Sequence, residues 1–275
     1  FANIHDISRR GSRLAPVSNW MSKVPGSKLV AHHLLGVHKE RSLTEFVRPS
    51  FPDWFHKREP LSEGRHGDVV LFHDTFMDYD APQIGVAATE LLDLAGYAVA
   101  LSDNVCCGRP MISKGYIDEA KEQARANVVR LHPQVAGGAF IVGCEPSCLL
   151  TLREEYPKML AGSDLAEKAR EVADRCVLLD EFLAGENRGE ELEFASEGPE
   201  VLFHGHCQQK AEADAALSLE LLRRAGYDAE MVRAPCCGMA GAFGFEREHY
   251  EASRKAFQRA LGPAIETHPD AQLVV

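Results

Sequence analysis

The chain has 275 residues, of which 45% are hydrophobic and 26% charged, a balance typical of folded globular proteins that argues against disorder. Its net charge of −11 at pH 7, with no basic stripe, argues against nucleic-acid binding. No apolar run could span a membrane and no export signal is present. We therefore expect its eight cysteines in a reducing, cytoplasmic compartment, where thiols more often bind metals or carry redox chemistry than form disulfides.

Residues 1–60 mix short helical patterns with several prolines, and we predict a mostly helical connecting arm there. Regular alternation begins after this arm, with DVVLFHDTF (68–76) as a buried strand and residues 81–96 as a helix. A second strand follows in YAVALSDNV (97–105), then a helix (116–132) and a third strand in AFIVGCEPSC (139–148). Residues 176–185 predict a further strand that passes into a short helix.

The same order of motifs then recurs. VLFHGHCQQ repeats VLFHDTFMD, LLRRAGYDAEMVRAPCCG repeats LLDLAGYAVALSDNVCCG, and AQLVV repeats AFIVG. The landmark pairs Phe72 and Phe203, Cys107 and Cys237, and Val142 and Val274 are 131, 130 and 132 residues apart. This constant spacing indicates an internal duplication.

The alternation of strands and helices within each repeat predicts an α/β fold with right-handed crossovers. We expect two tandem subdomains, each a small parallel sheet flanked by helices. The predicted boundaries are 1–60 for the arm, 61–197 for the first subdomain and 198–275 for the second. The acidic stretch 185–200 is the predicted link between the two subdomains.

Adjacent cysteines follow the second strand of each repeat and are themselves followed by glycine. Such a pair makes a poor disulfide, whereas the carboxyl edge of a parallel sheet is where such folds assemble their sites. Gly108 and Gly238 are expected to let the backbone approach a bulky inorganic group. The candidate ligands for a metal or cluster are Cys106, Cys107, Cys148, Cys207, Cys236 and Cys237.

The two repeats differ in their sets of ligands. The second repeat supplies Cys207, Cys236 and Cys237. By the spacing of the repeats, its fourth cysteine ligand is expected at about position 279, so this site is predicted to be truncated at the carboxyl terminus. Ligands from separate strand ends favour an iron–sulfur cluster over zinc there. The first half lacks a cysteine after its first strand and could hold zinc, a cluster or nothing. The further candidate ligands are Asp74, His73, Cys144 and His206. Alternatively, Cys144 is a buried core residue and His206 is a structural residue of the loop.

Six segments together resemble a known family: GSRLAPVSNW, FHDTFMDYDAP, CCGRPMISKG, GCEPSCLLTLREEYP, HGHCQQKA and CCGMAGAFGFEREHY. They are similar to the duplicated cysteine-rich (CCG) domain of the heterodisulfide reductase B-subunit family. The likeness is closer to the carboxyl-terminal part of large FAD-linked oxidases of the D-lactate, glycolate and D-2-hydroxyglutarate dehydrogenase type. It covers nearly the whole chain.

This resemblance implies an iron–sulfur region, of the 4Fe–4S kind, that passes electrons from reduced flavin to a quinone or another acceptor. It also implies FAD in an upstream domain, with that flavin domain and a ferredoxin-like domain as partners in the same or another chain. This chain by itself is then expected to be inactive. It is expected to lie in the cytoplasm or at the cytoplasmic face of the membrane. Two alternatives remain: a thiol–disulfide reductase module, and a zinc-stabilised interaction module without catalysis.

Overall fold

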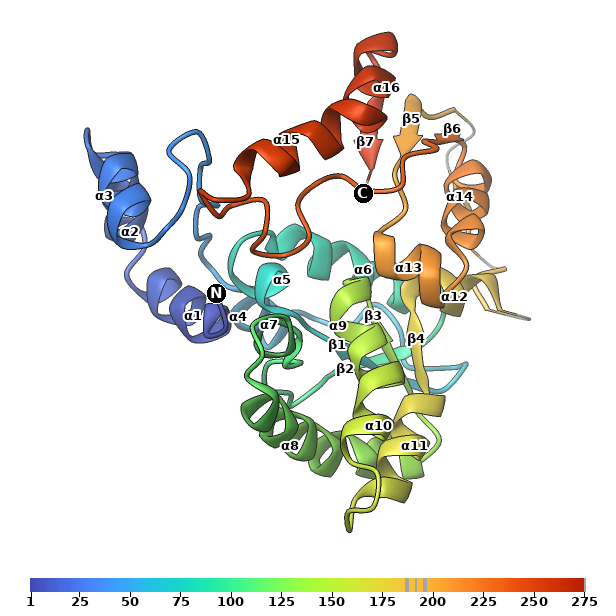
Figure 1. The fold of residues 1–275 in the computed structure, drawn as a ribbon. Coiled ribbons are helices and arrows are strands. Elements are labelled where there is room, and N and C mark those ends of the chain that lie inside the picture. Colours follow the sequence, from blue (N-terminus) through green and yellow to red (C-terminus); the bar gives the residue numbers. More distant parts are fainter. Residues whose placement is uncertain (186–187, 191, 195–196, 275) are drawn as a thin grey trace. The chain divides into compact units, whose positions relative to one another are not determined.

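A computed structural model describes the chain except residues 186–187, 191, 195–196 and 275. It separates into two compact units (Figure 1). The first comprises Phe1–Arg13 and Phe46–Leu192, and the second comprises Leu14–Glu45 and Glu193–Val275. The residues of the predicted arm therefore fall in both units, and part of the predicted acidic link lies outside the described residues.

The first unit contains a parallel sheet of four strands in the order β2-β1-β3-β4. Its strands are β1 (Asp68–Phe72), β2 (Ala98–Leu101), β3 (Phe140–Gly143) and β4 (Cys176–Leu178). The central strand β1 is buried on both faces, because helices cover the sheet and leave its Val and Leu side chains almost without exposure. The helical elements of this unit are α1 (Ile4–Arg13), α4 (Phe51–Phe55), α5 (Thr75–Tyr79), α6 (Pro82–Leu94), α7 (Arg109–Ser113), α8 (Ile117–Ala136), α9 (Pro146–Leu150), the π-helical turn η1 (Thr151–Glu155), α10 (Tyr156–Met159), α11 (Ala166–Asp174) and α12 (Leu179–Ala184).

Helix α8 shows why this sequence folds onto the sheet. Its buried residues Ala120, Ala124, Val128 and Leu131 recur every three or four positions, so they form one apolar stripe along the helix. Asn127 lies in the same buried register, which is unusual for an amide side chain. Its burial predicts a specific set of hydrogen bonds.

The second unit contains a parallel sheet of three strands in the order β6-β5-β7. Its strands are β5 (Glu200–Phe203), β6 (Asp228–Met231) and β7 (Gln272–Val274), and its helices are α2 (Val17–Lys23), α3 (Ser27–Leu34), α13 (Cys207–Glu212), α14 (Ala215–Arg224), α15 (Tyr250–Arg259) and α16 (Leu261–Thr267). A small core of Leu202, Val232, Ala234 and Leu261 joins the sheet to α16, and Cys237 packs against it.

The two sheets confirm the predicted fold class: each places its first strand in the centre, its second strand on one side and its third on the other. The first sheet extends this plan with β4, as the sequence pattern at 176–178 predicts. Among the described residues, the helices include none with the length and apolar character required to cross a bilayer. Cys176, in β4, is buried in the core with 1% of its surface exposed.

Candidate metal centre

The vicinal cysteines of both halves lie in loops that follow the carboxyl ends of edge strands, β2 and β6. The glycine after each pair is in the left-handed region, with φ of 85° at Gly108 and 86° at Gly238. Only glycine adopts this conformation without strain. The backbone conformation of the loop therefore requires glycine after each pair, independently of any group that the loops hold.

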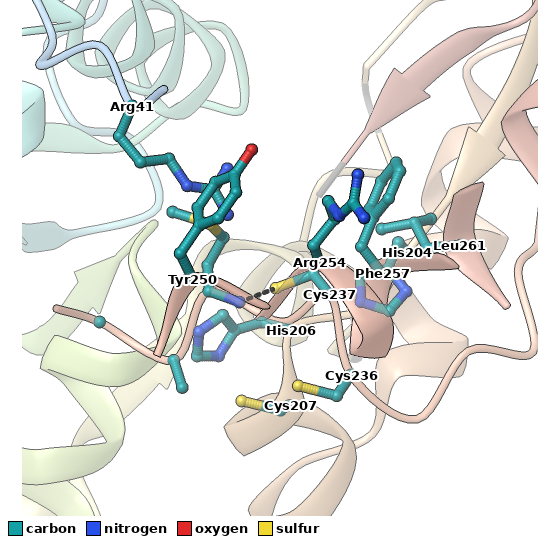
Figure 2. Close-up of a pocket in the computed structure, with 13 residues that line it drawn as sticks. Arg41, His204, His206, Cys207, Cys236, Cys237, Tyr250, Arg254, Phe257 and Leu261 are labelled. Carbon is teal, nitrogen blue, oxygen red and sulfur yellow. Dashed lines mark hydrogen bonds between the residues drawn. The ribbon is translucent and has the colours of Figure 1, made fainter. Parts of the chain in front are cut away.

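In the second unit, the thiols of Cys207, Cys236 and Cys237 line one cavity of about 520 Å³. Cys207 begins α13 at the end of the central strand, whereas Cys236 and Cys237 come from the loop after β6. Figure 2 shows the three cysteines together with His204 and His206 in the wall of this cavity. The structure thus brings together the three cysteines that the sequence predicts for this half.

Backbone N–H groups are directed at two of these sulfurs. The amide of Gly238 donates to Cys236 Sγ at 3.2 Å. The amide of Met239 donates to Cys237 Sγ at 3.5 Å, the dashed line at Cys237 in Figure 2. Amide donors stabilise a thiolate over a thiol. Lys210 Nζ donates to the carbonyl of Ala234 at 2.8 Å, which ties helix α13 to the loop that carries the pair.

Other residues that line the cavity come from α15, from α16 and, with Arg41, from the predicted arm. Arg41 donates to the carbonyl of Gly244 at 2.8 Å and to Ser253 Oγ at 2.9 Å, and its guanidinium lies 5.1 Å from the Tyr250 ring centre. His38 stacks on the same Tyr250 ring at 3.7 Å. The sequence patterns do not identify these residues, because their contacts join positions about 200 residues apart.

In the first unit, the thiols of Cys106, Cys107 and Cys148 also lie together. Cys107 Sγ donates to Cys148 Sγ at 3.0 Å, and Cys106 shares a hydrogen bond with Cys107. Cys148 is in α9, which follows β3, so the group joins the ends of two strands that flank β1. Cys144 directly follows β3, where burial and the charge of Asp74 raise its pKa to about 12.

Two buried polar side chains hold the first cysteine loop in place. Asn127 accepts from the amide of Val105 at 2.9 Å and donates to Tyr156 Oη at 2.8 Å. Tyr156 Oη in turn donates to the carbonyl of Cys107 at 2.9 Å. These two residues were missed by sequence reasoning, although an amide in the apolar stripe of α8 is a signal that could have identified Asn127.

The environment of the first cysteine group favours protonated thiols. A hydrogen bond from Cys107 lowers the pKa of Cys148, but burial and Asp74 raise it to about 11. The hydrogen bond with Cys107 and burial also raise the pKa of Cys106. Burial and the charge of Glu145 raise the pKa of Asp74 to about 7. A metal ion bound here would have to displace protons from these thiols.

In the first unit, both ring nitrogens of His73 lie within hydrogen-bond distance of a partner. Nδ1 lies 2.7 Å from an oxygen of Asp78, and Nε2 lies 3.0 Å from the carbonyl oxygen of Ser102. To serve as a ligand, His73 would have to give up one of these partners. His206 accepts from the amide of Gln208 at 3.3 Å and so caps α13, while its ring lines the cavity of the second unit.

Within the described part of the chain, no group of three or more His, Cys, Asp or Glu side chains is arranged to hold a single metal ion. The second unit instead spreads three thiols around a cavity of about 520 Å³, with amide donors on two of the sulfurs. It also leaves a buried histidine nitrogen, His204 Nδ1, without a partner among the described residues. Three cysteinates around one cavity could hold a cluster of several atoms.

Comparison with known proteins finds a cysteine-rich domain and similarity to proteins named for dehydrogenases. The family of CCG cysteine-rich domains matches residues 70–153, which run from β1 into η1 and contain the first cysteine group. The chain is 27% identical over 244 residues to a component of the anaerobic glycerol-3-phosphate dehydrogenase of Escherichia coli K12, covering 87% of this chain and 60% of that protein. It is 25% identical over 210 residues to the D-2-hydroxyglutarate dehydrogenase of the same organism, covering 76% of this chain and 20% of that enzyme. The chain therefore spans only part of the length of both relatives.

A third relative has a higher sequence identity over a shorter stretch. Lactate utilization protein A of Anoxybacillus flavithermus is 31% identical over 185 residues, which make up 64% of this chain and 74% of that protein. The cysteine-rich domain and this likeness confirm the resemblance found in the sequence. The chain belongs to the family of Lactate utilization protein A, and its residues 70–153 match the CCG cysteine-rich domain.

Proposed function

We propose that this chain is the iron–sulfur electron-transfer region of an FAD-linked 2-hydroxy acid dehydrogenase. The observation that carries the proposal is the gathering of Cys207, Cys236 and Cys237 around one cavity. The relatives support it, because they are named as a dehydrogenase, as a component of another dehydrogenase and as a lactate utilization protein. In this function, the flavin and a ferredoxin-like domain are the electron donors, and a quinone or another carrier is the acceptor.

The three thiolates of the second unit would hold the cluster, which we propose to be of the 4Fe–4S kind. A bound cluster supplies one-electron transfer. The amides of Gly238 and Met239 would stabilise negative charge on the Cys236 and Cys237 sulfurs, because both already donate to them. The wall formed by Tyr250 and Phe257 would limit the access of water to this side of the cavity.

For the first unit we propose that Cys106, Cys107 and Cys148 bind a second metal group, either a cluster or zinc, with Asp74 as the candidate fourth ligand. To hold one zinc ion these side chains would have to move closer together, because in the described residues they are not arranged around a single ion. The three thiols are already in contact, and the charge of Asp74 affects the pKa of Cys148. Zinc commonly takes four such ligands in a tetrahedral arrangement.

We propose that the protein lies in the cytoplasm, at the membrane face where a quinone would be reached. Helices α2 and α3 support this position, because several of their large apolar side chains are exposed: Val17, Trp20, Met21, Leu29, Val30 and Leu34. Lys23 and Lys28 lie on the same two helices. Exposed Trp and Leu beside lysine are typical of helices that bind a membrane surface.

Electron transfer can be tested on the full-length natural protein, purified without oxygen. Its visible absorbance should bleach when reduced FMN is added under anaerobic conditions, and should return when a soluble quinone follows. Cys237→Ala should remove the part of this response that belongs to the cluster of the second unit. Cys176→Ala should retain that part, because Cys176 is buried in the core of the first unit and does not line the cavity. A protein whose absorbance does not respond to reduced flavin would contradict the proposed function.

The contact between Cys107 and Cys148 favours a second candidate function, thiol–disulfide exchange. In that reaction the two thiols would reduce a small-molecule disulfide to two thiols and become a disulfide themselves. Reduction of such a substrate by one equivalent per protein, which persists in Cys237→Ala and is lost in Cys148→Ala, would favour this function over electron transfer.

A further inference from the structure

The duplication places one histidine at the same point in both halves. VLFHDTFMD (70–78) and VLFHGHCQQ (201–209) align without gaps, so His73 corresponds to His204 and Asp78 corresponds to Gln209. Each histidine directly follows the central strand of its own sheet, β1 or β5. The surroundings of the two rings can therefore be compared position by position.

In the first half, the histidine is His73, and its hydrogen-bond partners lie within the protein. Asp78 and the carbonyl of Ser102 engage the two ring nitrogens of His73. Burial lowers the pKa of His73, but the hydrogen bond and charge of Asp78 outweigh it, so the pKa is raised overall. The histidine thus has a complete set of partners within the protein.

In the second half, the helix carries a glutamine at the position of the acidic partner of His73. This residue, Gln209, corresponds to Asp78, and its amide nitrogen donates to Ser218 Oγ at 2.7 Å. His204 is only 2% exposed, yet its Nδ1 atom has no hydrogen-bond partner among the described residues. A buried polar atom without a partner destabilises the folded protein, and the described residues leave this nitrogen unsatisfied.

His204 lies in the wall of the cavity that contains Cys207, Cys236 and Cys237 (Figure 2). Burial, together with the positive charges of Lys210 and His206, lowers its pKa, which favours a neutral ring. A neutral imidazole has one N–H to donate and one nitrogen that accepts. Sulfur atoms in the cavity are acceptors for such an N–H.

We infer that His204 Nδ1 donates its hydrogen bond to a sulfur of the group that the three cysteines hold, and thereby positions that group and raises its reduction potential. Hydrogen bonds to cluster sulfurs set the potential, because they stabilise the additional negative charge of the reduced state. His204 is a positioning residue in this account. The inference rests on the proposed function, since it requires a cluster at these cysteines.

The test uses the full-length natural protein, purified without oxygen, and an electron paramagnetic resonance signal that Cys237→Ala abolishes. That signal belongs to the cluster of the second unit, and a redox titration gives its potential. His204→Leu removes the donor at similar size, whereas His204→Asn places an N–H donor close to the position of Nδ1. We expect a more negative potential in His204→Leu and a potential close to that of the unchanged protein in His204→Asn.

A second variant leaves His204 in place and gives it the partner that His73 has. In Gln209→Asp, the new carboxylate should engage Nδ1 and shift the potential in the same direction as His204→Leu. The carboxylate also adds a negative charge, so the same change is measured in the His204→Leu background, where its effect should be smaller. This difference separates the loss of the hydrogen bond from the effect of charge alone.

The outcomes distinguish the inference from the proposed function. Equal potentials in the unchanged protein and in His204→Leu, with equal iron content, would overturn the inference and leave the electron-transfer function standing. A protein with no iron and no signal in any form would overturn both. A shift in His204→Leu that His204→Asn does not rescue would contradict the assigned role of the Nδ1 donor.

Discussion

Gly238 packs directly against the backbone carbonyl of Ser253 in α15, so closely that a Cβ at this position would collide with it. Because Gly238 also has a φ of 86°, two separate constraints select glycine after the second cysteine pair. The close approach also fixes how α15, which carries Tyr250, lies against the loop of Cys236 and Cys237.

Replacing Gly238 by alanine should therefore destabilise the protein by more than the cost of its backbone conformation. Gly26→Ala is a matched control in the same unit, because Gly26 has a φ of 91° but no atom near the position of a Cβ. A left-handed alanine alone costs about 1–2 kcal/mol. Urea denaturation should show a larger loss of unfolding free energy for Gly238→Ala than for Gly26→Ala, and equal losses would contradict the packing argument.

Tyr156→Phe should loosen the loop that carries the first cysteine pair. The change removes a buried hydroxyl that bridges Asn127 and the carbonyl of Cys107, which leaves partners unpaired at a cost of about 1–3 kcal/mol. We expect the variant to be less stable and its Cys107 to react faster with a thiol reagent. In the unchanged protein Cys107 is only 3% exposed. Tyr116→Phe is the control, because Tyr116 is 52% exposed. Unchanged thiol reactivity in Tyr156→Phe would show that the bridge does not hold the loop.

Asp74→Asn should change how stability depends on pH. The pKa of Asp74 is raised from 3.8 to about 7, so between these values the folded protein binds a proton that the unfolded chain releases. Stability of the metal-free protein should therefore fall as pH rises through this window, by at most about 4 kcal/mol from this group. Asparagine keeps an oxygen to cap α5, as Asp74 does with the amides of Phe76 and Met77.

The variant should match the unchanged protein near pH 4 and exceed its stability at pH 8. Chemical denaturation at both pH values, with a chelator present, measures the two differences. A variant that is less stable at pH 8 would show that the carboxylate form of Asp74 has a stabilising partner.

Mild oxidation of the metal-free protein should join Cys107 to Cys148, because their sulfurs are already in contact at 3.0 Å. Peptide mass spectrometry under non-reducing conditions should find this pair, and Cys106→Ala should retain it. A bond from Cys106 to Cys148 in its place would contradict the arrangement of the three thiols.

Much of this structure could be predicted from the sequence because the fold repeats. Apolar strand patterns and the constant spacing of the landmarks predicted two parallel sheets, and the cysteines after strand ends predicted which thiols line the second cavity. The sequence predicts that Gly108 and Gly238 let the backbone approach an inorganic group, and the structure adds that both have a positive φ. That constraint depends on the backbone conformation of the loop, which the residue types alone do not reveal.

Other parts of the site depend on contacts between distant positions. Arg41 reaches Gly244 and Ser253, and Tyr156 reaches the carbonyl of Cys107; neither contact has a local pattern. Among the described residues His204 Nδ1 has no partner, and the difference between Asp78 and Gln209 in the aligned repeats is a sequence signal for this. The sequence does not reveal that the Gln209 amide donates to Ser218.

The most direct test of the account is the iron and acid-labile sulfide content of the full-length natural protein, purified without oxygen, beside Cys237→Ala and Cys176→Ala. We predict that Cys237→Ala loses about four iron and about four sulfide per chain, as expected for one 4Fe–4S cluster, and that Cys176→Ala keeps both. Iron and sulfide contents that are the same in all three proteins, or zinc without iron, would contradict the claim that these cysteines hold an iron–sulfur cluster.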